Sequence, residues 1–243
     1  MACLPPYTFP QEIEFSIFLL TCFIVLVKII MLVFMGVKIR RRKKEGLELA
    51  VSFLLAMWVL IFTLFVSRLF YMWFDFGLTH FKMECYPEVA IWWKIAQFII
   101  GVGLAEIVFV VDRKILNFKL KGIFAYIIIA GSIVMFLWPV NIVDDFATMS
   151  TFSILPQLGM LVVFIVFLNI AIKTSGRVRN TALIIIFAFL LYTVAALLVN
   201  AGIVKAMTDM FGMIAAFYLY MLQSTFKAIG IIMMAAGAAR WGS

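Results

Sequence analysis

Residues 13–37 read IEFSIFLLTCFIVLVKIIMLVFMGV, and residues 38–44, which follow directly, read KIRRRKK. An α-helix rises ~1.5 Å per residue, so about 20 apolar residues are enough to cover the ~30 Å hydrocarbon core of a bilayer. The first stretch therefore predicts a membrane-spanning helix. The second predicts a basic segment just outside the membrane on one side.

The same pattern recurs along the 243-residue chain and predicts seven spanning helices joined by short connections. Their expected ranges are 13–37, 47–74, 89–111, 121–140, 149–172, 182–204 and 211–239. The composition agrees, because 66% of the residues are hydrophobic and only 13% are charged. We therefore expect an all-α, polytopic, multi-pass protein of the cell membrane, in which 1–243 is one transmembrane domain without a soluble domain.

Positive charge is concentrated in every second connection. The basic residues there are Lys38, Arg40, Arg41, Arg42, Lys43 and Lys44, then Arg113, Lys114, Lys119 and Lys121, then Lys173, Arg177 and Arg179. Cytoplasmic loops carry such an excess, so we expect the amino terminus outside and the carboxyl terminus inside. The net charge of +8 then orients the chain and contacts anionic lipid headgroups. Nucleic-acid binding is not expected.

The sequence offers little for catalysis or for metal binding. His80 is the only histidine, and no spacing of cysteine and histidine indicates zinc. Enzymatic activity is therefore disfavoured, no cofactor is indicated, and any output would need a protein partner. Cys3 and Cys85 both fall on the predicted outer side, where they either pair in a disulfide or remain free thiols.

Two cations lie in the outer half of the predicted spans. Arg68 and Lys94 each lie ~10 Å below the outer interface. With Trp93 and Trp138 they would form an outward-facing pocket for a small anionic or lipid ligand. The alternative is that both side chains extend to the headgroups and that the tryptophans belong to an interfacial aromatic belt.

A second set of polar residues lies deeper. Lys28 and Lys227 are near mid-membrane, and Glu106 is the only acid well inside a predicted span. Such residues are rare in hydrocarbon and usually pair, so we expect Glu106 to pair with one of the two lysines. Tyr220, Gln223 and Lys227 recur at helical spacing and would share one face. This network would be either a structural salt bridge or a path for protons or ions.

Two seven-helix families share single features with the chain. Lys227 resembles the retinal-binding lysine of microbial rhodopsins in helix number, depth and topology. That resemblance is limited to Lys227, because Gln223 stands where the family usually has an acid. Asp112 and Arg113, at the inner end of the third expected helix, resemble the acid-arginine motif of G-protein-coupled receptors.

A broader resemblance is to small uncharacterised archaeal and prokaryotic seven-helix membrane proteins and to sensor membrane modules. It is carried by the segments Ser67-Arg68-Leu69-Phe70, Trp93-Lys94-Ile95 and Asp112-Arg113-Lys114. The resemblance implies a receptor or sensor without its own catalytic output, whose outer half meets a ligand. The alternatives are a proton-coupled transporter and a non-catalytic subunit of a membrane complex.

Overall fold

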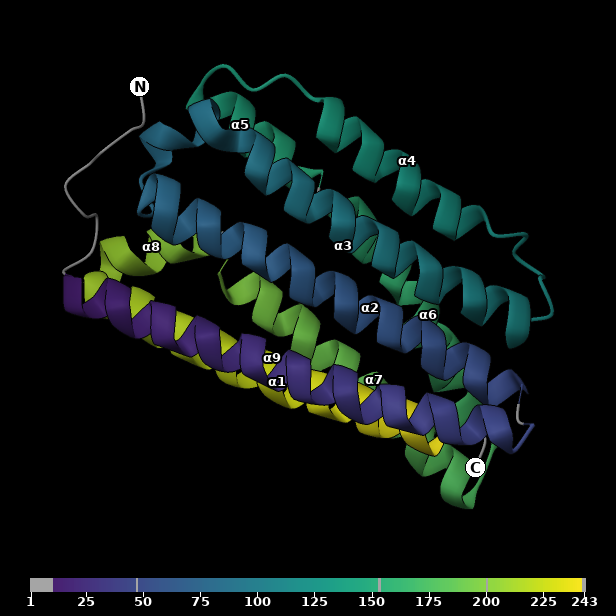
Figure 1. Cartoon of the computed structure of the whole chain (residues 1–243). Helices are drawn as coiled ribbons and strands as arrows, with labels where there is room; N and C mark the ends of the chain where they lie inside the picture. The colour runs from purple at the N-terminus through teal and green to yellow at the C-terminus, as the bar shows by residue number, and fades with distance from the viewer. Residues whose placement is uncertain (1–10, 47, 153, 200, 242–243) are drawn as a thin grey trace.

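A computed structural model describes residues 11–46, 48–152, 154–199 and 201–241, and every regular element in these ranges is helical (Figure 1). The elements are α1 (Gln11–Lys44), α2 (Glu48–Met72), the π-helix η1 (Trp73–Thr79), the 3₁₀-helix η2 (Met83–Cys85), α3 (Tyr86–Lys114), α4 (Ile123–Leu137), α5 (Val143–Thr151), α6 (Ile154–Lys173), α7 (Gly176–Leu198), α8 (Ala201–Phe211) and α9 (Met213–Arg240). The expectation of an all-α fold is confirmed.

Within the described ranges, five helical stretches are long and apolar enough to cross a bilayer, as expected of a multi-pass membrane protein. They are Glu12–Lys44, Ala50–Thr79, Tyr86–Lys114, Gly176–Leu198 and Phe217–Arg240. Two shorter apolar helices, Ile123–Leu137 and Leu161–Lys173, accompany them. The five long stretches coincide with five of the seven expected spans.

The other two expected spans are divided differently from the prediction. The stretch 121–140 contains α4, which ends at Leu137 because Trp138 precedes Pro139 and adopts an extended conformation (φ −58°, ψ 127°). The stretch 149–172 is shared between the end of α5 and most of α6. The α5 helix begins where the Asp145 carboxylate accepts hydrogen bonds from the backbone N–H groups of Asn141 and Ile142.

The long helices form one bundle whose neighbours are defined by their contacts (Figure 1). The α1 helix packs between α2 and α9, α3 packs between α2 and α4, and α6 contacts α3, α4 and α7. The α7–α9 contact closes the bundle. The start of α1 lies at one end of the bundle together with α5 and α8, and the end of α9 lies at the opposite end.

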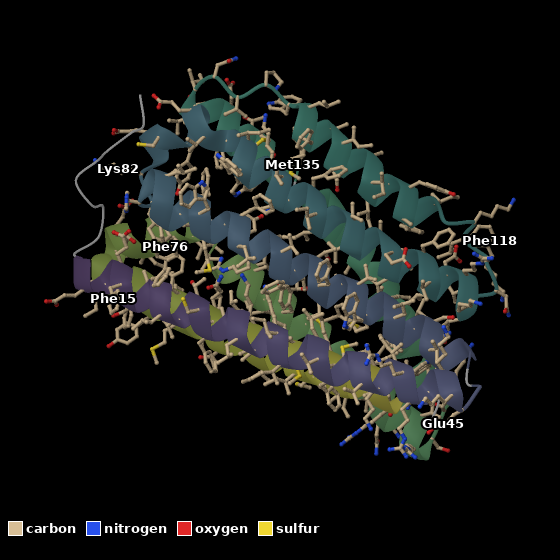
Figure 2. All side chains as sticks on the ribbon, viewed as in Figure 1. Phe15, Glu45, Phe76, Lys82, Phe118 and Met135 are labelled. Carbon is tan, nitrogen blue, oxygen red and sulfur yellow. The ribbon has the colours of Figure 1, made fainter. Side chains whose placement is uncertain are left out.

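Charge is distributed unequally between the two ends. Figure 2 shows Glu45 and Phe118 at one end and Phe15, Phe76 and Lys82 at the other. The end marked by Glu45 and Phe118 contains the turn after α1, the α3–α4 connection, the start of α7 and the end of α9, so all three basic segments lie there. We call it the basic end, and we call the opposite end the η1 end. The two alternatives for Cys3 and Cys85, a disulfide or free thiols, concern a residue outside the described ranges, because Cys3 is not among them.

Two glycines allow neighbouring helices to approach closely. A Cβ atom added to Gly103 of α3 would lie 1.9 Å from Oγ1 of Thr63 on α2, and one added to Gly101 would lie 2.0 Å from Oγ of Ser132 on α4. Helix association in lipid depends on this kind of small-residue packing, because hydrocarbon gives no hydrophobic drive between helices. The α3 helix is therefore held tightly by the helices on both sides.

Asp112 organises the connection between α3 and α4. Its buried carboxylate accepts hydrogen bonds from the backbone N–H groups of Leu120 (2.9 Å) and Gly122 (2.7 Å). The connection contains left-handed residues, among them Asn117 and Gly122 (φ 54° and 72°). The feature that resembled a receptor motif in the sequence thus supports the chain's own tight turn at the basic end.

Candidate functional site: a cationic cluster between α1, α2 and α9

The α1 helix places two polar side chains against α2. Thr21 and Lys28 are seven residues apart, which puts them on the same helical face, and both are buried. Lys28 is only 2% exposed, and its Nζ donates a hydrogen bond to the carbonyl oxygen of Leu64 (2.5 Å). That oxygen also accepts from the Ser67 hydroxyl (3.2 Å). The Lys28 ammonium is therefore held by a neutral carbonyl group.

Arg68 connects the same face of α2 to α1. Its Nη2 donates to Thr21 Oγ1 (2.8 Å), while its Nε is buried without a hydrogen-bond partner among the described residues. Because the guanidinium has five donors in a fixed fork, one hydroxyl satisfies only a small part of it. Arg68 therefore retains donor capacity inside the bundle.

The α9 helix contributes a third cation and its polar neighbours. Gln223 and Ser224 are buried, and Lys227 Nζ lies 6.0 Å from the ring centroid of Tyr192 on α7, within the range of a cation–π contact. The Gln223 side chain is 2% exposed, and its Oε1 has no hydrogen-bond partner in the described part of the chain. The expected stripe of Tyr220, Gln223 and Lys227 thus borders the same buried region.

The acid of the cluster comes from η1. Asp75 lies within electrostatic range of Arg68 and of Lys227, and Lys28 lies within range of both cations. Within the described ranges no carboxylate oxygen is within 4.0 Å of a nitrogen of these three cations. We call Lys28, Arg68, Asp75 and Lys227 the cationic cluster. It brings three basic side chains together with one acidic side chain.

The η1 segment that carries Asp75 is fixed to its surroundings at its far end. Thr79, the last residue of this π-helix, donates its hydroxyl to the carbonyl oxygen of Phe74 (2.8 Å), five residues earlier. Beyond it, His80 Nδ1 lies 2.8 Å from a carboxylate oxygen of Glu14 on α1, and the Phe81 ring packs on Tyr220 of α9 (5.7 Å between centroids). The chain from η1 to Phe81 therefore connects the end of α2 to α1 and to α9.

In the described part of the chain, Glu106 forms no ion pair with Lys28 or Lys227. Glu106 is exposed on α3, four residues after Val102, which is also exposed, whereas Leu104, Ile107 and Val108 face the interior. The helical period therefore turns Glu106 away from Lys28 and Lys227. The acidic side chain within electrostatic range of Lys227 is Asp75 instead. The sequence signal was its position seven residues after Arg68, which places the two side chains on one face of a continuous helix.

The expected outer pocket is not assembled either. Arg68 reaches Thr21 on α1, whereas Lys94 Nζ donates to the carbonyl oxygen of Trp138 at the end of α4 (2.5 Å), on the other side of the α2–α3 pair. Lys94 thus satisfies a terminal carbonyl of α4. Trp93 and Trp138 pack on aromatic rings of α5 and its exit, with centroid distances of 5.2 Å to Phe146 and 4.9 Å to Phe152. Arg68 belongs to the cationic cluster. Lys94, Trp93 and Trp138 lie instead where α3, α4 and α5 meet.

Within the ranges that the structure describes, no group of three His, Cys, Asp or Glu side chains could hold a metal ion.

No protein-family model, no curated protein and no solved structure matches this chain. Function is therefore inferred from the chain's own residues.

Proposed function

We propose that the chain is a seven-span membrane receptor or sensor, with its amino terminus outside, that binds a small anion at the cationic cluster and passes the signal to a partner protein. The seven spans would comprise the five long stretches, α4, and α5 with α6. The location of all three basic segments at one end supports the orientation, because cytoplasmic loops carry such an excess. On this orientation the η1 end faces outward.

The observation that carries the proposal is the excess of positive charge in the cluster. Lys28, Arg68 and Lys227 lie within electrostatic range of one another, inside a bundle whose outer surface is apolar. Asp75 is within range of Arg68 and Lys227. Each charge buried in hydrocarbon costs about 3 kcal/mol on insertion scales unless a counter-charge or water compensates it. A bound anion supplies that counter-charge. The orphan donor Arg68 Nε offers such a ligand a charge-assisted hydrogen bond.

Binding at this place couples to the packing of the bundle. The cluster takes its side chains from α1, α2, η1 and α9, so a ligand that contacts all of them draws these elements together. A ligand shifts an equilibrium only by its difference in affinity between two packings. The cations repel one another without the anion and are screened by it, which provides that difference.

The test is anion-dependent stability of the purified protein in a neutral detergent. Sodium sulfate, sodium phosphate and sodium succinate are each tested at constant ionic strength. We expect one of these anions to raise the melting temperature more than the other two do. A ligand at 100 times its Kd stabilises the native state by about 2.7 kcal/mol. The effect should disappear in Arg68→Gln and persist in Lys94→Gln, which removes a cation that lies outside the cluster. An equal response of both variants would refute the site, as would the same response of the wild type to all three salts.

A proton-coupled transporter is the alternative, and Asp75 is the observation that favours it. A carboxylate beside Lys227, within a cluster assembled from several helices, is the kind of site that carriers use for coupling ions. Uptake of the stabilising anion into proteoliposomes under an imposed pH gradient distinguishes the two. Uptake that is lost in Asp75→Asn would establish the carrier, whereas binding without uptake would leave the receptor.

A further inference from the structure

A groove of about 440 Å³ opens at the basic end between α1, α7 and α9. On α1 its lining begins at Phe34, six residues beyond Lys28 of the cationic cluster. Its cationic lining comes from three separate parts of the chain: Lys38, Arg41 and Arg42 on α1, Arg177 on α7 and Arg240 on α9. Among the described residues, Glu45 is the one acidic side chain in its lining. The groove therefore has a strong excess of positive charge.

Arg42 forms a fixed wall of this groove. It is 5% exposed, and its guanidinium donates to the carbonyl oxygens of Ala239 (2.6 Å) and Trp241 at the end of α9. The Trp241 ring in turn packs on Phe53 and Phe167, with centroid distances of 5.8 and 5.1 Å. The groove is thus built on a rigid junction of α1 and α9.

The groove also has an apolar part of its lining, which continues into the exposed apolar surface of α1. Phe34 lines it and is 39% exposed, and Lys38 Nζ lies 6.0 Å above its ring. On the same helix Ile30, Val33 and Val37 are exposed, with Val33 at 63%. Both α1 and α9 contribute membrane spans that end at this groove. A soluble anion would use only its basic side.

We propose that this groove binds an anionic phospholipid, with the phosphate headgroup among Lys38, Arg41, Arg177 and Arg240 and one acyl chain along the side of α1 that carries Phe34. Basic pockets at the cytoplasmic ends of spanning helices bind such headgroups. The bound lipid joins α1, α7 and α9 at the basic end. This inference does not depend on the function proposed for the cationic cluster.

Lipid retention tests the inference directly. The protein is assembled in nanodiscs of phosphatidylcholine with and without phosphatidylglycerol, released in the gas phase, and its bound lipid identified by native mass spectrometry. The groove variant is Lys38→Gln/Arg177→Gln. The matched control is Arg113→Gln/Lys114→Gln, which removes two exposed cations from α3 at the same end. Circular dichroism and melting in detergent establish that both variants are folded.

We expect the wild type and the control to retain one phosphatidylglycerol and the groove variant to bind it roughly tenfold more weakly. Equal retention by the groove variant and the control would overturn the proposal, because it would indicate general attraction to the basic end. Soluble glycerol 3-phosphate provides the second comparison. If it stabilises the wild type as much as phosphatidylglycerol does, the site takes a free phosphate ester, and the lipid assignment fails.

Discussion

Replacing Gly103 by alanine tests the close packing of α2 against α3. The added Cβ would lie 1.9 Å from Thr63 Oγ1 and 3.0 Å from Thr63 Cβ, whereas ordinary contacts of a Cβ atom begin near 3.4 Å. The Thr63 hydroxyl already donates to the carbonyl oxygen of Leu60 (2.8 Å), so rotating it away sacrifices a buried hydrogen bond. Either that loss or the separation of the helices costs about 1–3 kcal/mol.

Gly36→Ala is the matched control. Gly36 lies within α1, and the nearest atom to its added Cβ is Trp58 Nε1 at 3.9 Å, an ordinary contact. Both substitutions gain the same helix propensity, about 1 kcal/mol, so the difference between them isolates the steric cost. We expect Gly103→Ala to be less stable than Gly36→Ala by about 1–3 kcal/mol.

Reversible unfolding in mixed micelles, followed by circular dichroism as the denaturing detergent is increased, measures that difference. Gly103→Ala/Thr63→Ala should recover part of the loss, because it removes the hydroxyl that the new methyl group meets. Equal stability of the two single variants would refute the reasoning, since it would mean that α2 and α3 can separate without cost.

Three further substitutions should show the roles of buried charged groups. Lys28→Met should raise the unfolding free energy in detergent without added anion by about 3 kcal/mol, because it removes a buried cation that only a carbonyl group compensates; a lower stability would argue against the charge excess. Asp112→Ala should lower the unfolding free energy by about 2–4 kcal/mol and speed amide exchange at 115–122, since two backbone donors lose their acceptor. The same result from the exposed control Arg113→Ala would contradict this role. Arg42→Gln should speed amide exchange in the last turn of α9 roughly tenfold, because terminal carbonyls lose their donor. The control is Arg41→Gln, which should leave that exchange rate unchanged because Arg41 pairs with the exposed Glu45.

The long helices could be predicted from the sequence, because the length of an apolar run determines whether a helix can cross a bilayer. The runs 13–37, 89–111 and 211–239 appear as α1, α3 and α9. The α1 and α3 helices extend beyond both ends of their runs, whereas α9 begins two residues later than expected. The stretch 121–140 could not be predicted in the same way. Its hydropathy is continuous across Trp138 and Pro139, whereas the helix stops there because the backbone before a proline is extended.

The candidate site could be predicted only in part. The depth of Lys28 and Lys227 in their apolar runs singled out both lysines, and the structure shows Lys28 buried and Lys227 half-buried. Depth alone also favoured Glu106, but a residue's depth does not say which way it faces around the helix axis. The exposed positions Val102 and Glu106 share the outward face of α3. Asp75 lies one residue beyond the expected span 47–74. Its spacing of seven residues from Arg68 indicates a shared face only if the helical path continues through η1, and hydropathy alone does not indicate that continuation.

Because η1 is a π-helix, the number of residues between α2 and α3 is constrained. A wider turn accommodates more residues per turn than an α-helix does, and each residue added to or removed from a helix rotates everything beyond it by ~100°. Asp75 would then leave the cluster, and His80 and Phe81 would lose their places against Glu14 and Tyr220. In 73–79, insertions and deletions should therefore be tolerated less well than many substitutions.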